Sequence, residues 1–143
     1  MEKEIIDLGH GKVEVFKDGH LIYLNVVGEY TDDDAIRMTE YLEGFFTESC
    51  GKTVRVWDSR NISETGFKLT SEGTDRFADW SRDMRKKWPD NVAYMIGDNP
   101  LIFGVSRMYE LKASDNDASI RVVQRIDELP EKIKERIFKF LEN

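Results

Sequence analysis

Segments with the character of β-strands and of amphipathic helices alternate along most of this 143-residue chain. Runs of β-branched and aromatic residues are followed by stretches in which apolar residues recur at helical spacing. Alternation of this kind is typical of α/β domains, in which right-handed crossovers make neighbouring strands parallel. We therefore expect a single-domain α/β fold over residues 1–143, with the element order β-β-α-β-α-β-α-β-α around one mixed sheet.

The first two strands differ from the rest because only a short turn joins them. Residues 13–16 and 21–27 are β-rich, and Asp18-Gly19 between them suits the positive φ angles of a tight hairpin. Two strands joined in this way are antiparallel. The sheet is thus predicted to open with an antiparallel amino-terminal hairpin and to continue with parallel strands.

Capping residues mark where the helices begin. Thr31 with Asp34 three residues later predicts the start of the first helix, and Thr70 or Ser71 caps the second. The other predicted elements are strands at 52–58, 91–96 and 119–123, a helix after Pro100 and a closing helix after Pro130. Each helix is short enough to act as a crossover within one domain.

Charge and composition exclude several classes of protein. The formal net charge is -7 and the pI is about 4.9, which argues against a nucleic-acid partner because phosphate binding needs a concentrated basic face. No apolar run reaches transmembrane length, and the charged amino end is unlike a secretory signal. The single cysteine, Cys50, rules out a disulfide framework. We expect a cytoplasmic protein that does not span a membrane.

Residues 52–73 hold the most informative local feature, a strand that we expect to end at Asp58, a polar loop, and a helix start near Ser71. Partners and ligands of α/β domains usually meet the carboxyl ends of strands. Asp58, Ser59 and Arg60 are therefore predicted to lie on a binding rim. Two alternatives stay open: Asp58 pairs locally with Arg60 and shapes the turn, or Asp58 is an acid or base whose anionic substrate Arg60 stabilises.

Motifs that would identify a reaction are absent. The chain has no nucleophile elbow, P-loop or dinucleotide fingerprint. His10 and His20 both fall near the first hairpin and are interpreted as surface residues. Residues 115–117 resemble the start of a calcium loop, but the required glycine and final glutamate are missing. We predict no metal site, no cofactor and no enzymatic activity.

Bulky aromatic residues suggest a second kind of site. Trp80, Tyr94 and Phe103, with Trp88 and Tyr109, are predicted to line an apolar pocket between the helices and the sheet. The alternative is ordinary core packing, which aromatic residues also favour.

The order of elements and three stretches, residues 24–31, 54–61 and 92–98, resemble the STAS domains of anti-sigma-factor antagonists. The chain is more similar to the bacterial STAS-like or SpoIIAA-like branch, whose fold is shared with CRAL-TRIO lipid-transfer domains. This resemblance implies a non-enzymatic regulatory or protein-interaction module. In some relatives, phosphorylation of a serine at the start of the second helix switches the partner.

The phosphorylation motif is altered in this sequence. Ser71 matches the first serine of the family pattern, whereas Glu72 stands where the phosphorylated serine usually lies. We therefore expect Asp58, Ser59, Arg60, Ser71 and Glu72 to form a contact surface for a protein partner. The altered motif argues against a kinase-controlled switch, and phosphorylation of Ser71 stays open. Two alternatives stay open. The domain binds a lipid, in the form of a small lipophilic ligand between helices and sheet, or it forms a homodimer paired through the hairpin edge.

Overall fold

The structure is a computed structural model that describes residues 2–113 and 120–142. The described residues form one sheet whose strands lie in the order β1-β2-β3-β4-β5-β6. The strands are β1 (Glu2–Asp7), β2 (Gly11–Asp18), β3 (Leu21–Thr31), β4 (Val54–Lys68), β5 (Val92–Ile96) and β6 (Ile120–Val123). The helices are α1 (Asp32–Glu48), α2 (Ser71–Lys87), α3 (Pro100–Ala113), the 3-10 turn η1 (Ile126–Glu128) and α4 (Glu131–Leu141). Residues 115–117, considered above for calcium, lie outside the described residues.

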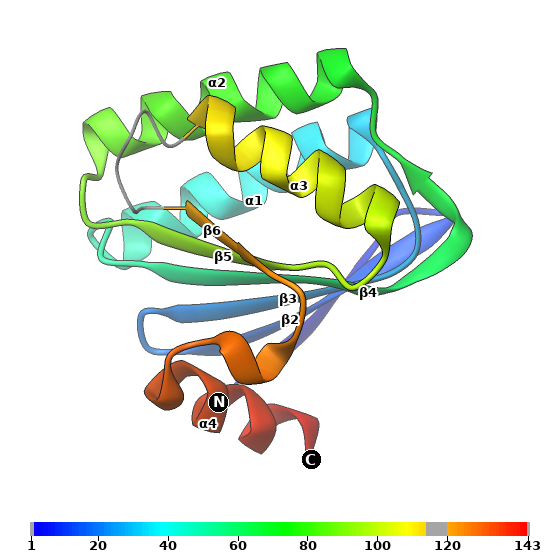
Figure 1. Cartoon of the computed structure of the whole chain (residues 1–143). Coiled ribbons are helices and arrows are strands. Elements are labelled where there is room, and N and C mark those ends of the chain that lie inside the picture. Colours follow the sequence, from blue (N-terminus) through cyan, green and yellow to red (C-terminus); the bar gives the residue numbers. More distant parts are fainter. Residues whose placement is uncertain (1, 114–119, 143) are drawn as a thin grey trace.

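The sheet separates two unequal layers of helices. Figure 1 shows α1, α2 and α3 on one face, and α4 with the short orange turn η1 on the other. Strands β1 to β3 are antiparallel, and β3 to β6 are parallel. The predicted mixed α/β sheet with an antiparallel amino-terminal hairpin is therefore confirmed. None of the helices in the described part of the chain has the length and apolar character needed to cross a membrane.

Strand β1 was not predicted and adds an edge to the sheet. It pairs with β2 in antiparallel register, from Glu2 opposite Lys17 to Asp7 opposite Lys12. Its sequence is mostly charged, and only Ile6 packs against the main core. Edge strands tolerate charges because one of their sides pairs with no neighbour. The alternating pattern that marks an inner strand is consequently missing.

The caps of α1 and α2 fix the ends of strands β3 and β4. The Thr31 hydroxyl accepts from the Asp34 N–H at 3.3 Å, and the Asp34 carboxylate accepts from the Thr31 N–H at 2.8 Å. This capping box confirms the predicted start of α1. In α2 the cap is Thr70, whose hydroxyl accepts from the Gly73 N–H at 3.0 Å, so Ser71 is the first helical residue.

Strand β4 continues through the segment that was predicted to be a polar loop. After Asp58 it keeps pairing with β3 as far as Lys68, with register shifts between Asn25 and Val27 and between Gly28 and Tyr30. Such bulges insert extra residues and interrupt the two-residue alternation of a strand. The prediction that the strand ends at Asp58 was therefore wrong.

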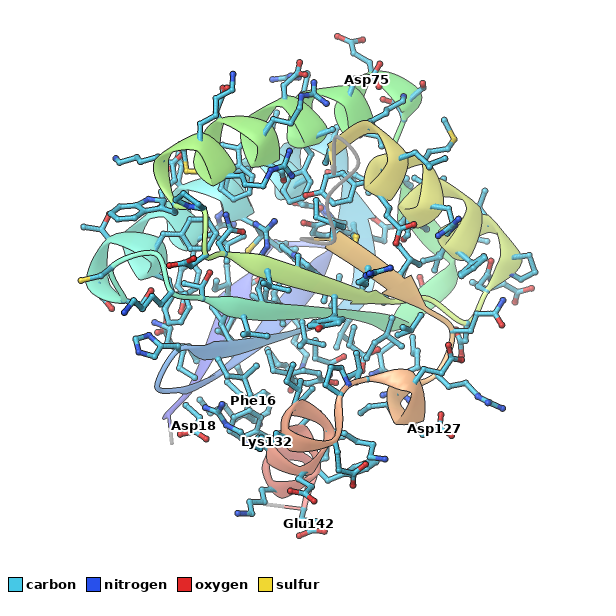
Figure 2. All side chains as sticks on the ribbon, turned by 60° about the vertical axis from the view of Figure 1, so that its left-hand side comes forward. Phe16, Asp18, Asp75, Asp127, Lys132 and Glu142 are labelled. Carbon is cyan, nitrogen blue, oxygen red and sulfur yellow. The ribbon has the colours of Figure 1, made fainter. Side chains whose placement is uncertain are left out.

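Helix α4 packs beneath the first hairpin and closes the second face of the sheet. Figure 2 shows its ribbon close to Phe16 and Asp18. The ring of Phe140 stacks on Phe16 with centroids 5.2 Å apart, and Arg136 Nε donates to the Asp18 carboxylate at 3.0 Å. This helix has a strongly one-sided apolar pattern, and its buried residues are Ile137 and Phe140.

Candidate functional site

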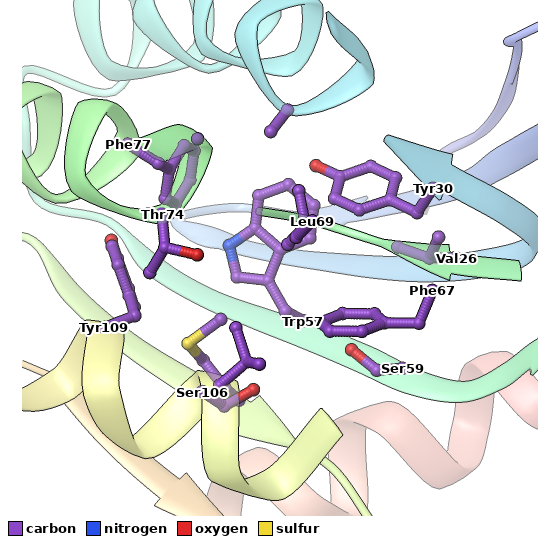
Figure 3. A pocket seen from close by; sticks show the side chains of 14 residues that line it. Val26, Tyr30, Trp57, Ser59, Phe67, Leu69, Thr74, Phe77, Ser106 and Tyr109 are labelled. Atoms are coloured by element: carbon purple, nitrogen blue, oxygen red, sulfur yellow. The ribbon is translucent and has the colours of Figure 1, made fainter. Parts of the chain in front are cut away.

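A cavity lies where strands β3 and β4 end and helices α1, α2 and α3 begin. Its walls are mostly apolar, and Figure 3 shows the Trp57 indole among the side chains that line it. The lining residues are Val26, Tyr30, Ala35, Trp57, Ser59, Phe67, Leu69, Gly73, Thr74, Phe77, Met95, Val105, Ser106 and Tyr109. This is the carboxyl edge of the parallel strands, where ligands of open α/β sheets usually bind.

The cavity is small. Its total volume is about 550 Å³ including space that is open to solvent, and the centre of a water molecule fits in about 50 Å³ of it. One water molecule needs roughly 10–15 Å³ of the space that is open to water centres. The space therefore suits a molecule about the size of one ring or a short chain, not a two-chain lipid.

One polar group in the cavity wall has no partner. The Trp57 side chain is only 4% exposed, and its Nε1–H finds no acceptor among the described residues. Two other polar groups in the wall are already used: the Thr74 hydroxyl donates to the Thr70 carbonyl at 2.8 Å, and the Tyr109 hydroxyl bonds to Ser81. Burial raises the pKa of Tyr30 well above its ordinary value, so this residue stays neutral. The Trp57 N–H is thus a buried donor in a mostly apolar wall, without an acceptor among the described residues.

Alternation along β4 divides the predicted rim between the two faces of the sheet. Ser59 lies on the same face as Trp57 and lines the cavity. Asp58 faces the other way and is fully buried, and its neighbour Arg60 shares that face. Among the three rim residues predicted at the end of this strand, only Ser59 therefore reaches the cavity.

Asp58 is the centre of a closed polar cluster on the α4 side of the sheet. Its carboxylate accepts from Arg60 Nε at 2.9 Å, from Arg60 Nη2 at 2.7 Å and from the Arg60 backbone N–H at 3.0 Å. The Tyr23 hydroxyl donates to the same carboxylate. Burial, and then the Asp58 charge, raise the pKa of Tyr23, while hydrogen bonding to Asp58 raises that of Arg60. The local pairing with Arg60 that the sequence allowed is present.

The other predicted contact residues are close to the cavity but do not line it. Ser71 and Glu72 are exposed in the first turn of α2, whereas the next two residues, Gly73 and Thr74, are buried and form part of the wall. The two predicted residues lie on the outer side of that turn. They border the site from outside.

The structure has a cavity lined by aromatic residues, but these are not the residues that the sequence predicted. Trp80 stacks on Phe46 of α1 with centroids 5.9 Å apart, and Tyr94 packs in the α4-side cluster. Phe103 is half-buried on α3 and is not part of the wall. The aromatic residues found there are Tyr30, Trp57, Phe67, Phe77 and Tyr109. Only Tyr109 was among the aromatic residues considered from the sequence.

The described residues contain no group of three or more His, Cys, Asp or Glu side chains placed to hold a metal ion. His10, interpreted as a surface residue, is exposed and lies with its Nε2 2.7 Å from the Asp34 carboxylate. This contact supports the start of α1, not a catalytic arrangement.

Comparison with known proteins adds information on the fold. No protein-family model matches the chain, and no curated protein matches it. Among solved structures, the chain is similar to an uncharacterised protein of the DUF3478 family from Shewanella loihica PV-4, which is described as having a SpoIIAA-like fold. The TM-score is 0.51 at 13% identity, over 90% of this chain and 92% of that one. The chain has a SpoIIAA-like fold. The resemblance drawn from the sequence is confirmed at this level, and the likeness extends to the fold alone.

Proposed function

We propose that this SpoIIAA-like domain is a non-enzymatic binding module whose ligand is a small apolar molecule seated in the cavity. The observation that carries the proposal is the unpaired Trp57 N–H, held in a buried and mostly apolar wall. A buried donor without an acceptor costs about 1–3 kcal/mol. A ligand with an oxygen acceptor removes that cost, so the proposed ligand combines an apolar body with one such oxygen.

Catalysis has no part in the proposal. Asp58, the candidate acid or base, is fully buried on the opposite face and its carboxylate is occupied by Arg60 and Tyr23. A substrate in the cavity would be separated from it by the sheet. The residues that do face the cavity are aromatic, aliphatic or hydroxyl-bearing, as is common in sites that bind without reaction.

Calorimetric titration with 2-phenylethanol and 1-octanol tests the proposal, with native mass spectrometry of the purified protein to detect a co-purifying ligand. We expect Trp57→Phe to weaken binding about tenfold, because it removes one hydrogen bond but keeps a ring. Trp88→Phe is the matched control, because Trp88 follows α2 and lies outside the cavity wall. Absence of any bound ligand, with no heat from either alcohol, would contradict the proposal.

A second candidate is the regulatory or protein-interaction role that the sequence resemblance implies. The observation that favours it is an exposed apolar stripe on α3, where Leu101, Met108 and Leu111 are 60%, 43% and 72% exposed. Their spacing of seven and three residues places them on one side of the helix. The same helix contributes Val105 and Ser106 to the cavity, so ligand binding and a partner contact would share α3.

Affinity capture with Met108→Lys and Leu111→Lys tests the second candidate. Both changes should reduce capture of a specific partner without lowering the melting temperature. Ile5→Lys is the control, because Ile5 is 57% exposed on β1, away from α3. Sedimentation at rising protein concentration distinguishes a second copy of the chain from a different partner. Capture that all three variants leave unchanged would remove this stripe from consideration.

A further inference from the structure

A buried arginine lies beside the cavity without a counter-charge. Arg55 is 1% exposed, and its Nε and Nη1 groups find no acceptor among the described residues. Proteins rarely bury a charged group unless it is paired and hydrogen-bonded. Arginine also keeps its proton under nearly all conditions. Arg55 is therefore a fixed positive charge in an apolar interior.

Two aromatic rings hold the guanidinium in place. Its Cζ lies 5.5 Å from the centre of the Phe46 ring and 5.3 Å from that of Trp80. Cation–π contacts of this kind stabilise the charge through the ring faces. They provide no acceptor for the N–H groups. Burial lowers the pKa of Arg55, and the electrostatic effect of Tyr109 and a hydrogen bond to its hydroxyl raise it. A hydroxyl is a weaker partner for this charge than a carboxylate.

Along β4, Arg55 precedes two residues of the cavity wall on the same face of the sheet. Side chains two apart on a strand share a face, so Arg55, Trp57 and Ser59 project from the same side of β4 at intervals of roughly 7 Å. Trp57 and Ser59 line the cavity. Tyr109 also lines it and interacts electrostatically with Arg55. Arg55 itself does not line the cavity, so a ligand along β4 reaches the guanidinium by taking the place of the Tyr109 hydroxyl.

We infer that the ligand is a small carboxylic acid, whose apolar body lies against Trp57 and Tyr109 and whose carboxylate pairs with Arg55. This inference rests on the proposed function. A carboxylate matches the forked donors of arginine, and the pairing is strong where water is excluded. An alcohol of the same shape leaves the charge unpaired, and an amine is repelled. The site should therefore prefer an acid to its matched alcohol by at least about tenfold.

The test is calorimetric titration of the full chain at pH 7 with phenylacetate and 4-phenylbutyrate, each compared with the corresponding alcohol. Wild-type protein should bind at least one acid about tenfold or more tightly than its alcohol. Arg55→Met should abolish this preference while alcohol binding persists. The control is Arg76→Met, which removes an exposed arginine of α2 and should leave the preference intact. If Arg55→Met fails to fold, Arg55→Lys replaces it, and a smaller preference is expected because the forked geometry is lost.

Thermal unfolding without ligand provides a second measurement. Because Arg55 has no counter-charge among the described residues, Arg55→Met should raise the melting temperature or leave it unchanged. A fall of many degrees would mean that the protein itself pairs this charge, and would overturn the inference. Equal binding of acids and alcohols by wild-type protein would overturn it while the proposed function stands. Binding of neither class would overturn both.

Discussion

Replacing Asp58 by asparagine tests whether this residue holds the sheet together or recognises a partner. The substitution keeps the shape of the side chain but removes its charge and one of its two acceptor oxygens. In the structure those oxygens accept from the Tyr23 hydroxyl and from three N–H groups of Arg60. If the cluster is structural, stability should fall; if Asp58 recognises a partner, binding should fall instead.

The expected loss is about 3 kcal/mol in the free energy of unfolding. Removing one partner from a buried ion pair costs roughly 3–5 kcal/mol, because the other charge is left uncompensated. Here the lower end applies, since the Arg60 side chain is 31% exposed and water can solvate it after the change. For a domain of this size the loss corresponds to a fall in melting temperature of about 10 °C.

Urea unfolding followed by tryptophan fluorescence measures this loss, and Arg60→Met completes a double-mutant cycle. In the Arg60→Met background the cost of Asp58→Asn should shrink by about 2 kcal/mol, because the substitution then leaves no unpaired guanidinium behind. A cost below about 1 kcal/mol in the wild-type background, or equal costs in both backgrounds, would refute the structural role. Reduced partner capture at unchanged stability would restore Asp58 to the binding surface.

Three more substitutions test the packing and the electrostatics. Gly73→Ala should destabilise by about 1–3 kcal/mol in urea unfolding, because its Cβ would clash with the Asp32 carboxylate, whose Oδ1 accepts from the Thr70 N–H at 2.9 Å. Gly44→Ala in α1 meets no atom within 4 Å and should stabilise by up to about 1 kcal/mol; similar effects at both glycines would contradict this. Above about pH 10 the unfolded chain loses the Tyr23 proton that the folded protein keeps, so stability falls as the pH rises. Tyr23→Phe should flatten that fall between pH 9 and 11, and an unchanged slope would show that Tyr23 does not cause it.

The fold could be predicted from the sequence where local signals agree with the tertiary structure. The pair Thr31 and Asp34 forms the capping box that its spacing indicated, and the hairpin around Gly19 has the positive φ of 61° that the turn requires. These features depend on residues close together in the chain. Strand β1 depends on pairing with β2 and on one inward residue, Ile6, so its sequence carries little signal of its own.

The cavity lies at the edge of the sheet where the sequence predicted a site, but most of its lining residues were not among those predicted. The carboxyl end of the parallel strands was expected to hold it, and the cavity is there. Asp58 and Arg60 were assigned to that edge because bulges in β4 hide the strand that continues beyond them. Counting alternate residues from Arg55 would have placed Trp57 and Ser59 together on one face. Which faces of α2 and α3 meet that strand depends on how the helices are rotated, and this cannot be read from their spacing.

Strand order has a consequence for how the chain is made. In the described sheet every strand lies beside the one that precedes it in the sequence. During synthesis on the ribosome each new strand can therefore add to an edge that already exists, and none has to insert between two others. Helix α4 follows all six described strands in the sequence and packs on the first hairpin, through Arg136 and Asp18, 118 residues apart. Its arrival covers the apolar face that the growing sheet leaves open until then.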